Sequence, residues 1–377
     1  MKNAFLFSLL FCISSSAIYA SGARTTAQSD NISKMFPGFT NPVSGGPLQR
    51  ACHAGNMDSI KKLLKHGQDI NGIDENGHTP LDAAVEGDRP DVVNYLIKNG
   101  AKVNLKNKSN VSALAVAIFR NNFPMCNLLF DKGADIDATD TIGLSLLDRA
   151  TFNDNLEMVK TLIAHGAKIN DKDKFQWCPV IYAAGNGHID ILKYFIENGV
   201  DLNATTSTGK TCMHYSAMYG QDSSIAMLMK AGMSINVPDK DSLTPLCMLL
   251  SPGPLDSVKK MEVMKFMLEK GADPNLRDKK RGMSLHMAAF SGQTQLAELL
   301  IDHGADVNAA DRNGATPLHI AVVKNHPDLV ELLINKKANI NAEDINGKTP
   351  LDLVPYTGAD EVKRLLIING ALNGKRQ

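Results

Sequence analysis

Hydrophobic and polar positions along the chain follow a pattern that returns at a fixed interval. Each unit contains two short apolar runs, and one apolar position in the first run serves as a marker for the unit. The second run, for example Val92-Val93 and Tyr95-Leu96-Ile97, has the spacing of one buried helix face. The markers are Leu48, Leu81, Leu114, Leu147, Val180, Met213, Leu246, Leu285, Leu318 and Leu351. Neighbouring markers differ by 33 in number, except for one interval of 39 that ends at Leu285. This constant period predicts a stacked array of ten helical units.

The boundaries of the predicted helices carry capping residues. Thr or Ser often stands two places before the marker, as at Thr79, where a hydroxyl caps a new helix, and Pro80 suits the first helical position. The second run stops at a glycine in nine units, which favours the left-handed conformation of a helix C-terminus. Only Lys337 breaks that glycine series. Turn residues such as Asn76-Gly77 separate the units and predict hairpin loops, called fingers below.

These motifs resemble the ankyrin repeat, most closely in the segments Asn313-Gly-Ala-Thr-Pro-Leu-His-Ile-Ala321 and Leu329-Val330-Glu-Leu-Leu333. The resemblance covers roughly Gly46 to Asn373. It implies an all-α ankyrin-repeat solenoid of about ten helix-turn-helix repeats with β-hairpin loops, occupying residues 46–377. Members of the family usually bind other proteins through the fingers and the concave face of the first helices, and this expectation rests on analogy.

The first residues do not belong to the array. Lys2, the apolar stretch from Phe5 to Ile13 and the small residues up to Ala20 predict a signal peptide over residues 1–20. The alternatives are an uncleaved anchor and a chance apolar start. Residues 21–45 are rich in Ser, Thr, Gly and Pro and predict a flexible linker. We therefore expect an exported protein, either periplasmic or secreted.

Composition and motifs argue against most other functions. The net charge is +0, with 40 basic and 40 acidic residues, which offers no global attraction for nucleic acid or membrane. Gly209-Lys210-Thr211 looks like a phosphate-binding loop but falls on the inter-repeat turn. His214, His286 and His319 share one repeat position, so we expect hydrogen bonds within their own turns and no metal site. The five cysteines after the signal peptide are expected to be free thiols. We predict no catalytic residues, no cofactor and no membrane span after signal removal.

Two departures from the repeat predict a partner-binding surface. Phe175 and Trp177 replace the usual turn residues of one finger, where we expect both rings to be exposed and to act as binding hot spots. The alternative is packing against a neighbouring finger, for example against Leu144. The position five residues after each marker, called the first-helix row, is mostly apolar. An exposed row would bind a partner, and tighter packing between first helices is the alternative. The predicted partner-binding residues are Phe119, Phe152, Phe175, Trp177, Met218, Tyr219 and Phe290.

The 39-residue interval contains a six-residue insertion in repeat 7. Ser251-Pro-Gly-Pro254 should end the first helix early, because proline stops a helix. The insertion is either a hinge or second contact site, or a tolerated change without function. Taken together, the sequence predicts an exported, monomeric ankyrin-repeat protein that binds an unidentified protein partner, for example as a bacterial secreted effector. The alternative is a periplasmic inhibitor or supporting factor of one enzyme, with a toxin-neutralising or stress-protective role.

Overall fold

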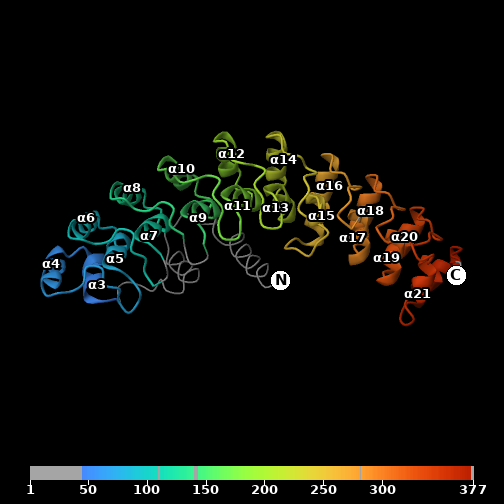
Figure 1. The fold of residues 1–377 in the computed structure, drawn as a ribbon, viewed down its shortest axis with the longest axis horizontal. Coiled ribbons are helices and arrows are strands. Elements are labelled where there is room, and N and C mark those ends of the chain that lie inside the picture. Colours follow the sequence, from blue (N-terminus) through green and yellow to red (C-terminus); the bar gives the residue numbers. More distant parts are fainter. Residues whose placement is uncertain (1–44, 109–110, 140–142, 281, 375–377) are drawn as a thin grey trace. The chain divides into compact units, whose positions relative to one another are not determined.

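The computed structural model describes residues 45–108, 111–139, 143–280 and 282–374 (Figure 1). The predicted signal peptide lies outside these residues, as does the predicted linker except for its last residue. The described part of the chain contains helices and turns and no assigned β-strand. It divides after Tyr182 into two compact units, which we call unit 1 and unit 2.

Unit 1 contains four complete helix pairs, each matching one sequence repeat. The pairs are α3 (Pro47–Ala54) with α4 (Met57–Lys65), α5 (Pro80–Glu86) with α6 (Pro90–Lys98), α7 (Ala113–Phe119) with α8 (Phe123–Asp131), and α9 (Leu146–Phe152) with α10 (Leu156–Ala164). The next helix, α11 (Pro179–Asn186), spans the division between the units.

Unit 2 continues the same order of helices. Its elements are α12 (Ile189–Glu197), α13 (Cys212–Met218), α14 (Asp222–Lys230), α15 (Pro245–Met248), α16 (Ser257–Glu269), α17 (Ser284–Ser291), α18 (Thr294–Asp302), α19 (Pro317–Val323), α20 (Pro327–Asn335), the 3₁₀ turn η2 (Pro350–Leu353) and α21 (Asp360–Ile368). With these elements, the described residues contain all ten predicted repeats.

The repeats are built from short buried first helices and longer second helices that are buried on one face. Every residue of α5 is buried, whereas α6 buries Val92, Val93 and Leu96. The first helix begins where the sequence predicts. Thr79 Oγ1 accepts from the backbone N–H of Asp82 at 3.0 Å, and an Asp82 carboxylate oxygen accepts from the N–H of Thr79 at 3.1 Å. This reciprocal capping satisfies amides that have no partner inside the helix.

The fingers that the structure describes are tight turns, and most of them are closed around one Asp or Asn side chain. In the first, Asp74 N–H donates to the carbonyl of His78 at 3.0 Å, and Asp74 Oδ1 accepts from the N–H of His78 at 2.9 Å. Neighbouring fingers are joined by single backbone bonds, such as Lys108 N–H to Gly77 O at 3.2 Å. Because so few ladder bonds form, the predicted hairpins are present as turns without assigned strands.

The ends of the second helices confirm the glycine series and explain its exception. Gly304 has φ 87° and Gly370 has φ 85°, both in the left-handed region that glycine tolerates without strain. Lys337 occupies the equivalent position and adopts φ 70°. The backbone conformation of this position is therefore kept even where the residue is not glycine.

The six inserted residues lie partly in the connection after α15 and partly in a lengthened α16. As predicted, the first helix of repeat 7 ends early, since α15 has 4 residues, whereas α16 has 13. Leu255, in the inserted connection, lies against Gly220, so that a Cβ placed on this glycine would be 3.2 Å from a Leu255 methyl. Lys259, in the added turn of α16, pairs with Asp222 at 3.0 Å. The insertion therefore packs on the helix connection of repeat 6.

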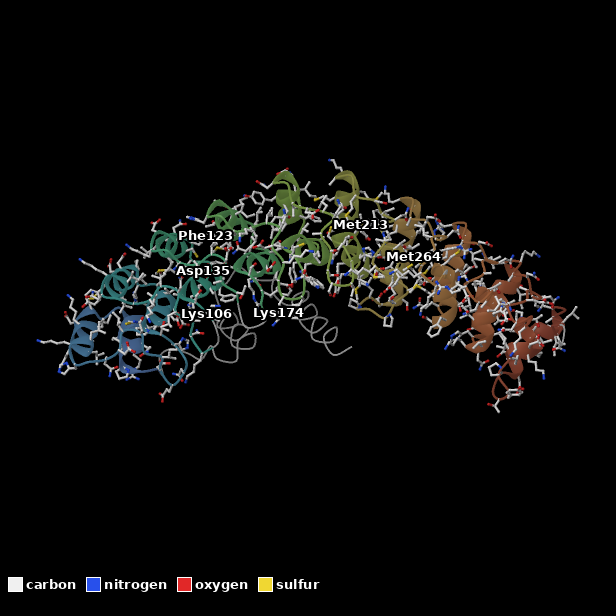
Figure 2. All side chains as sticks on the ribbon, in the orientation of Figure 1. Lys106, Phe123, Asp135, Lys174, Met213 and Met264 are labelled. Atoms are coloured by element: carbon white, nitrogen blue, oxygen red, sulfur yellow. The ribbon has the colours of Figure 1, made fainter. Side chains whose placement is uncertain are left out.

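The interior of unit 2 is rich in sulfur. Met213 and Met264, labelled in Figure 2, are both fully buried. Cys212 lies 3.7 Å from the sulfur of Met233.

The cysteines at 52, 126, 178, 212 and 247 are free and buried, as expected. Burial raises the pKa of the Cys52 thiol to about 12, which keeps it protonated and unreactive at neutral pH.

Candidate functional site

Trp177 anchors the unusual finger of repeat 5 instead of extending from it. Its side chain is only 8% exposed, so the expectation of an exposed indole is wrong. The buried carboxylate of Asp173 organises this turn, because Oδ1 accepts from the N–H of Trp177 at 2.9 Å and from that of Phe175 at 2.8 Å. Phe175 is half-buried, with the Lys174 ammonium 5.1 Å from its ring centroid.

Tyr182 on α11 explains why the indole is buried. The Trp177 and Tyr182 ring centroids are 5.2 Å apart, and the Tyr182 hydroxyl donates to Asp173 Oδ2 at 2.7 Å. Phe152 packs edge-on against Tyr182, with the ring centroids 6.4 Å apart. Burial raises the pKa of Asp173, while the hydrogen bond from Tyr182 opposes that shift. The finger therefore packs on the helix of its own repeat, and its Lys174 side chain also lies against Gly143 of the neighbouring finger.

The sequence contained a signal for this cluster that the sequence analysis missed. Tyr182 stands two places after its marker, where the four earlier repeats carry Arg50, Ala83, Val116 and Arg149, so it is the first aromatic residue at this position. A large aromatic at this position extends from the first helix toward the finger. It coincides with the unusual aromatics of the same repeat, and the two departures form one packed unit.

The other predicted site residues of unit 1 are also largely covered. Phe152 is 6% exposed, and Phe119, at the end of α7, is half-buried. Glu86, in the same first-helix row, is buried and forms an ion pair with Arg120. In unit 1 the row is therefore mainly part of the packing between repeats, which was the alternative considered from the sequence.

Unit 2 holds the remaining three predicted residues, at two places. Met218 and Tyr219 at the end of α13 are half-buried, and the Tyr219 ring stacks on Tyr215 with centroids 6.5 Å apart. Phe290 on α17 is 58% exposed. A role in partner binding stays a prediction for all seven residues, and among them Phe290 offers the most accessible side chain.

The histidines at the shared repeat position connect adjacent repeats. His319 Nδ1 accepts from the N–H of Thr316 at 3.1 Å, as expected within its own turn, and Nε2 lies 3.1 Å from the carbonyl of Lys348 in the next finger. His214 and His286 repeat this arrangement. Burial lowers the pKa of all three, because a charged imidazolium is poorly solvated there.

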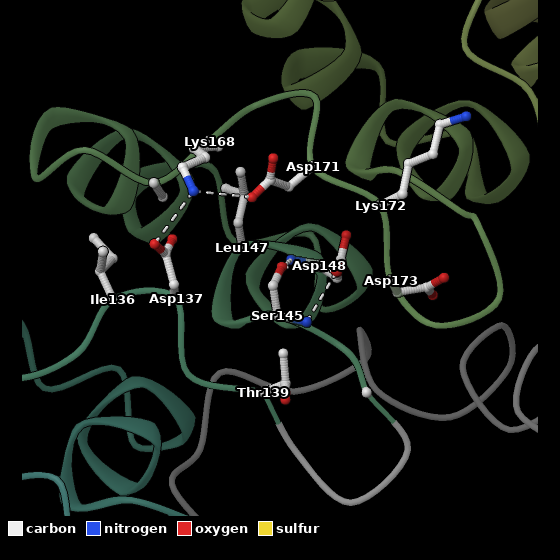
Figure 3. A pocket seen from close by; sticks show the side chains of 12 residues that line it. Ile136, Asp137, Thr139, Ser145, Leu147, Asp148, Lys168, Asp171, Lys172 and Asp173 are labelled. Carbon is white, nitrogen blue, oxygen red and sulfur yellow. Dashed lines mark hydrogen bonds and ion pairs between the residues drawn. The ribbon is translucent and has the colours of Figure 1, made fainter.

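A small polar cavity of about 80 Å³ lies in unit 1 beside α9 (Figure 3). Its lining includes Asp137, Ser145, Asp148 and Lys168. The Lys168 ammonium lies 3.5 Å from carboxylate oxygens of both Asp137 and Asp171, and these charges raise its pKa. Across the described residues, no group of three His, Cys, Asp or Glu side chains is arranged to hold a metal ion. The cavity is small and its groups pair with one another, so we assign it no reaction.

Comparison with known proteins supports the fold. The family model for ankyrin repeats in three copies matches residues 34–107, 102–173, 146–239, 256–344 and 285–376. The crystal structure of the human ASB11 ankyrin repeat domain is similar, with a TM-score of 0.52 and 22% sequence identity, over 61% of this chain and 100% of that one. No curated protein matches the sequence. None of the helices in the described ranges is long and apolar enough to cross a bilayer.

Ankyrin-repeat domains are typically scaffolds that bind protein partners. The matched segments cover most of the sequence, and the ten helix pairs follow the repeat period with its capping residues, fingers and left-handed helix ends. The chain therefore belongs to the ankyrin-repeat family.

Proposed function

We propose that this protein is exported and acts as a binding scaffold for another protein, using the fingers and the exposed parts of the first helices, as a bacterial secreted effector does. The observation that carries the binding surface is the exposure of apolar side chains at the first-helix row of unit 2. Phe290, Val323 and Tyr356 are 58%, 47% and 108% exposed, although the same row is largely buried in unit 1. Exposed apolar rows of this kind are typical of interaction surfaces.

Export is supported by the first twenty residues and by the state of the thiols. Lys2 followed by the apolar stretch Phe5 to Ile13 has the organisation of a secretory signal. An exported protein encounters oxidising conditions, under which accessible thiols form mixed disulfides. The described cysteines are all buried, and the pKa of both Cys52 and Cys126 is raised to about 12. The fold would therefore tolerate oxidising surroundings without disulfides.

Two measurements test this proposal. N-terminal sequencing of protein recovered outside the cytoplasm of the producing cells should find a start between Ala17 and Arg24, and Leu9→Arg should hold the chain in the cytoplasm. Photo-crosslinking residues placed at Lys174, on a finger, and at Val323 should capture a specific protein, whereas the same residue at Glu331, on the exposed face of α20, should not. An intact Met1 on a cytosolic chain would reject export. Equal crosslinking at all three positions would reject the binding surface.

A further inference from the structure

Three apolar side chains of unit 2 form one exposed row, which we call the apolar row: Phe290, Val323 and Tyr356. They occupy the first-helix row in three successive repeats. The repeats are directly bonded to one another, since His326 Nε2 lies 3.4 Å from the carbonyl of Phe290, and Asn325 Nδ2 donates to the carbonyl of Gly358 at 2.9 Å. The apolar row therefore lies on three successive repeats that are hydrogen-bonded to one another.

The last repeat increases this exposure. Its first helical element, η2, is a single 3₁₀ turn that ends at Leu353, and Val354 then adopts extended angles of φ −59° and ψ 128°. Pro355 accounts for this ending, because the residue before a proline avoids the helical region. Tyr356 consequently lies beyond the helix, where its side chain is fully exposed. In the preceding repeats Phe290 and Val323 remain on helices.

Positive charge accompanies the apolar row. The Lys324 ammonium lies 4.0 Å from the centroid of the Phe290 ring. The segments that carry the row, residues 287–293, 320–326 and 353–359, contain no Asp or Glu, while Asp352, Asp360 and Glu361 lie beside the last segment in the sequence. The Lys324 cation, placed beside an exposed aromatic ring, can attract an anionic group from a partner.

The fingers that lead into these helices add further cations. Lys279, Lys280 and Arg312 are exposed, and the Arg312 guanidinium donates to the carbonyl of Lys279 at 2.6 Å, which links two adjacent fingers. The carboxylate of Asp278 is turned to its own backbone, where Oδ1 accepts from the N–H of Lys280 at 2.8 Å and from that of Gly282 at 2.7 Å. Since this carboxylate is used within the turn, the fingertip presents mainly positive groups.

We propose that the apolar row and these cations bind an acidic segment of a partner protein that carries aromatic or aliphatic side chains between its carboxylates. This inference rests on the proposed function and names the chemistry of the partner. Apolar side chains of the segment would cover Phe290, Val323 and Tyr356, while its carboxylates would pair with Lys324 and the basic fingers. An apolar row alone would accept many sequences, and the cations select acidic ones.

The test uses the purified full chain and a displayed library of random twelve-residue peptides. Peptides enriched on the protein should combine Asp or Glu with Phe, Trp, Tyr, Leu or Ile. Synthetic copies are then titrated by fluorescence anisotropy against Phe290→Ser/Tyr356→Ser, Lys324→Glu and a matched control, Ile368→Ser. Ile368 is 64% exposed but lies outside the apolar row, on α21. Circular dichroism establishes that each variant is folded.

The expected result is a loss of affinity of at least about tenfold in the double variant, as is common when interface anchors are truncated. Lys324→Glu should weaken binding several-fold, with the difference shrinking at high salt, and Ile368→Ser should change affinity less than about twofold. The inference is overturned by an empty selection, by enriched peptides without carboxylates, or by equal affinity for the double variant. Self-association of the full chain through this row, measured by sedimentation, would also reject it, since a second copy would then be the occupant. Crosslinking at Lys174 but not at Val323 would preserve the proposed function and reject the inference.

Discussion

Replacing Trp177 with alanine should destabilise the protein, because the indole is buried against Tyr182. The side chain is 8% exposed and its ring centroid lies 5.2 Å from that of Tyr182. A buried tryptophan covers roughly 150–250 Å², which at about 25 cal/mol per Å² is worth about 4–6 kcal/mol as an upper bound. Truncation of buried Trp or Phe to Ala commonly costs about 3–5 kcal/mol. A finger next to solvent relaxes more easily than a core, so we expect a loss of about 3 kcal/mol.

Urea unfolding followed by circular dichroism measures this loss, and Trp177→Phe is the matched control. The phenyl ring keeps most of the contact with Tyr182, so the control should lose about 1 kcal/mol, a typical cost for a conservative core change. Trp177 is the only tryptophan in the chain. Native fluorescence should therefore be blue-shifted and should move to the red as the finger unfolds.

This reasoning would be refuted if Trp177→Ala unfolded at the wild-type urea concentration and the native wild-type protein already emitted at the wavelength of free tryptophan. The indole would then be exposed, as the sequence analysis expected. Partner affinity measured with Trp177→Phe separately tests the remaining prediction that the ring contacts a partner, because this variant keeps the finger folded.

Three further outcomes follow from the geometry of single residues. Lys337→Gly should raise the free energy of unfolding by about 0.5–1 kcal/mol, because a left-handed non-glycine residue is strained; the reverse change, Gly304→Lys, should lower it in denaturant titrations. The pKa of His319 is lowered in the folded state, where burial disfavours the charged imidazolium. Its contribution to the free energy of unfolding is therefore complete above the unfolded pKa of about 6.5. That contribution declines as pH falls below this value, by at most about 1.4 kcal/mol per pH unit. The stability advantage of the wild type over His319→Gln should therefore shrink between pH 7 and pH 5, and an advantage independent of pH would contradict this. Leu255→Ala should destabilise the connection at Gly220 and increase its amide hydrogen exchange, and exchange unchanged from the wild type would show that this contact is not structural.

The repeat period predicted the fold because each ankyrin unit is specified locally. Thr79 and Pro80 begin a helix through hydrogen bonding and backbone geometry that involve only the adjacent residues. Lys337 shows the strength of this local code, since the position keeps φ 70° without glycine. The second bond of His319, to the carbonyl of Lys348, was not predicted because it joins two repeats.

The candidate site was predicted less well, because exposure depends on neighbours that the period does not identify. The same register position holds the buried Phe152 in unit 1 and the exposed Phe290 in unit 2. Phe152 is covered because the next repeat supplies Tyr182, whose ring lies 6.4 Å away. The sequence located the insertion at Ser251-Pro-Gly-Pro254 but could not show that its remaining residues lengthen α16.

A departure from the repeat can therefore serve packing or binding, and the neighbouring repeat decides which. Phe175, Trp177 and Tyr182 all differ from the usual residues of the repeat. Each donates a hydrogen bond to the carboxylate of Asp173, from the backbone N–H of Phe175 and Trp177 and from the hydroxyl of Tyr182. Among the described residues Phe290 lacks an aromatic ring partner of this kind, and the cation of Lys324 lies against its ring instead. Unusual residues that pack against one another stabilise the array. An exposed apolar side chain next to a positive charge contributes favourable free energy only when a partner covers it. On this physical ground the binding specificity should reside in the repeats that carry Phe290, Val323 and Tyr356, and the aromatic finger of repeat 5 should chiefly maintain the shape of its own repeat.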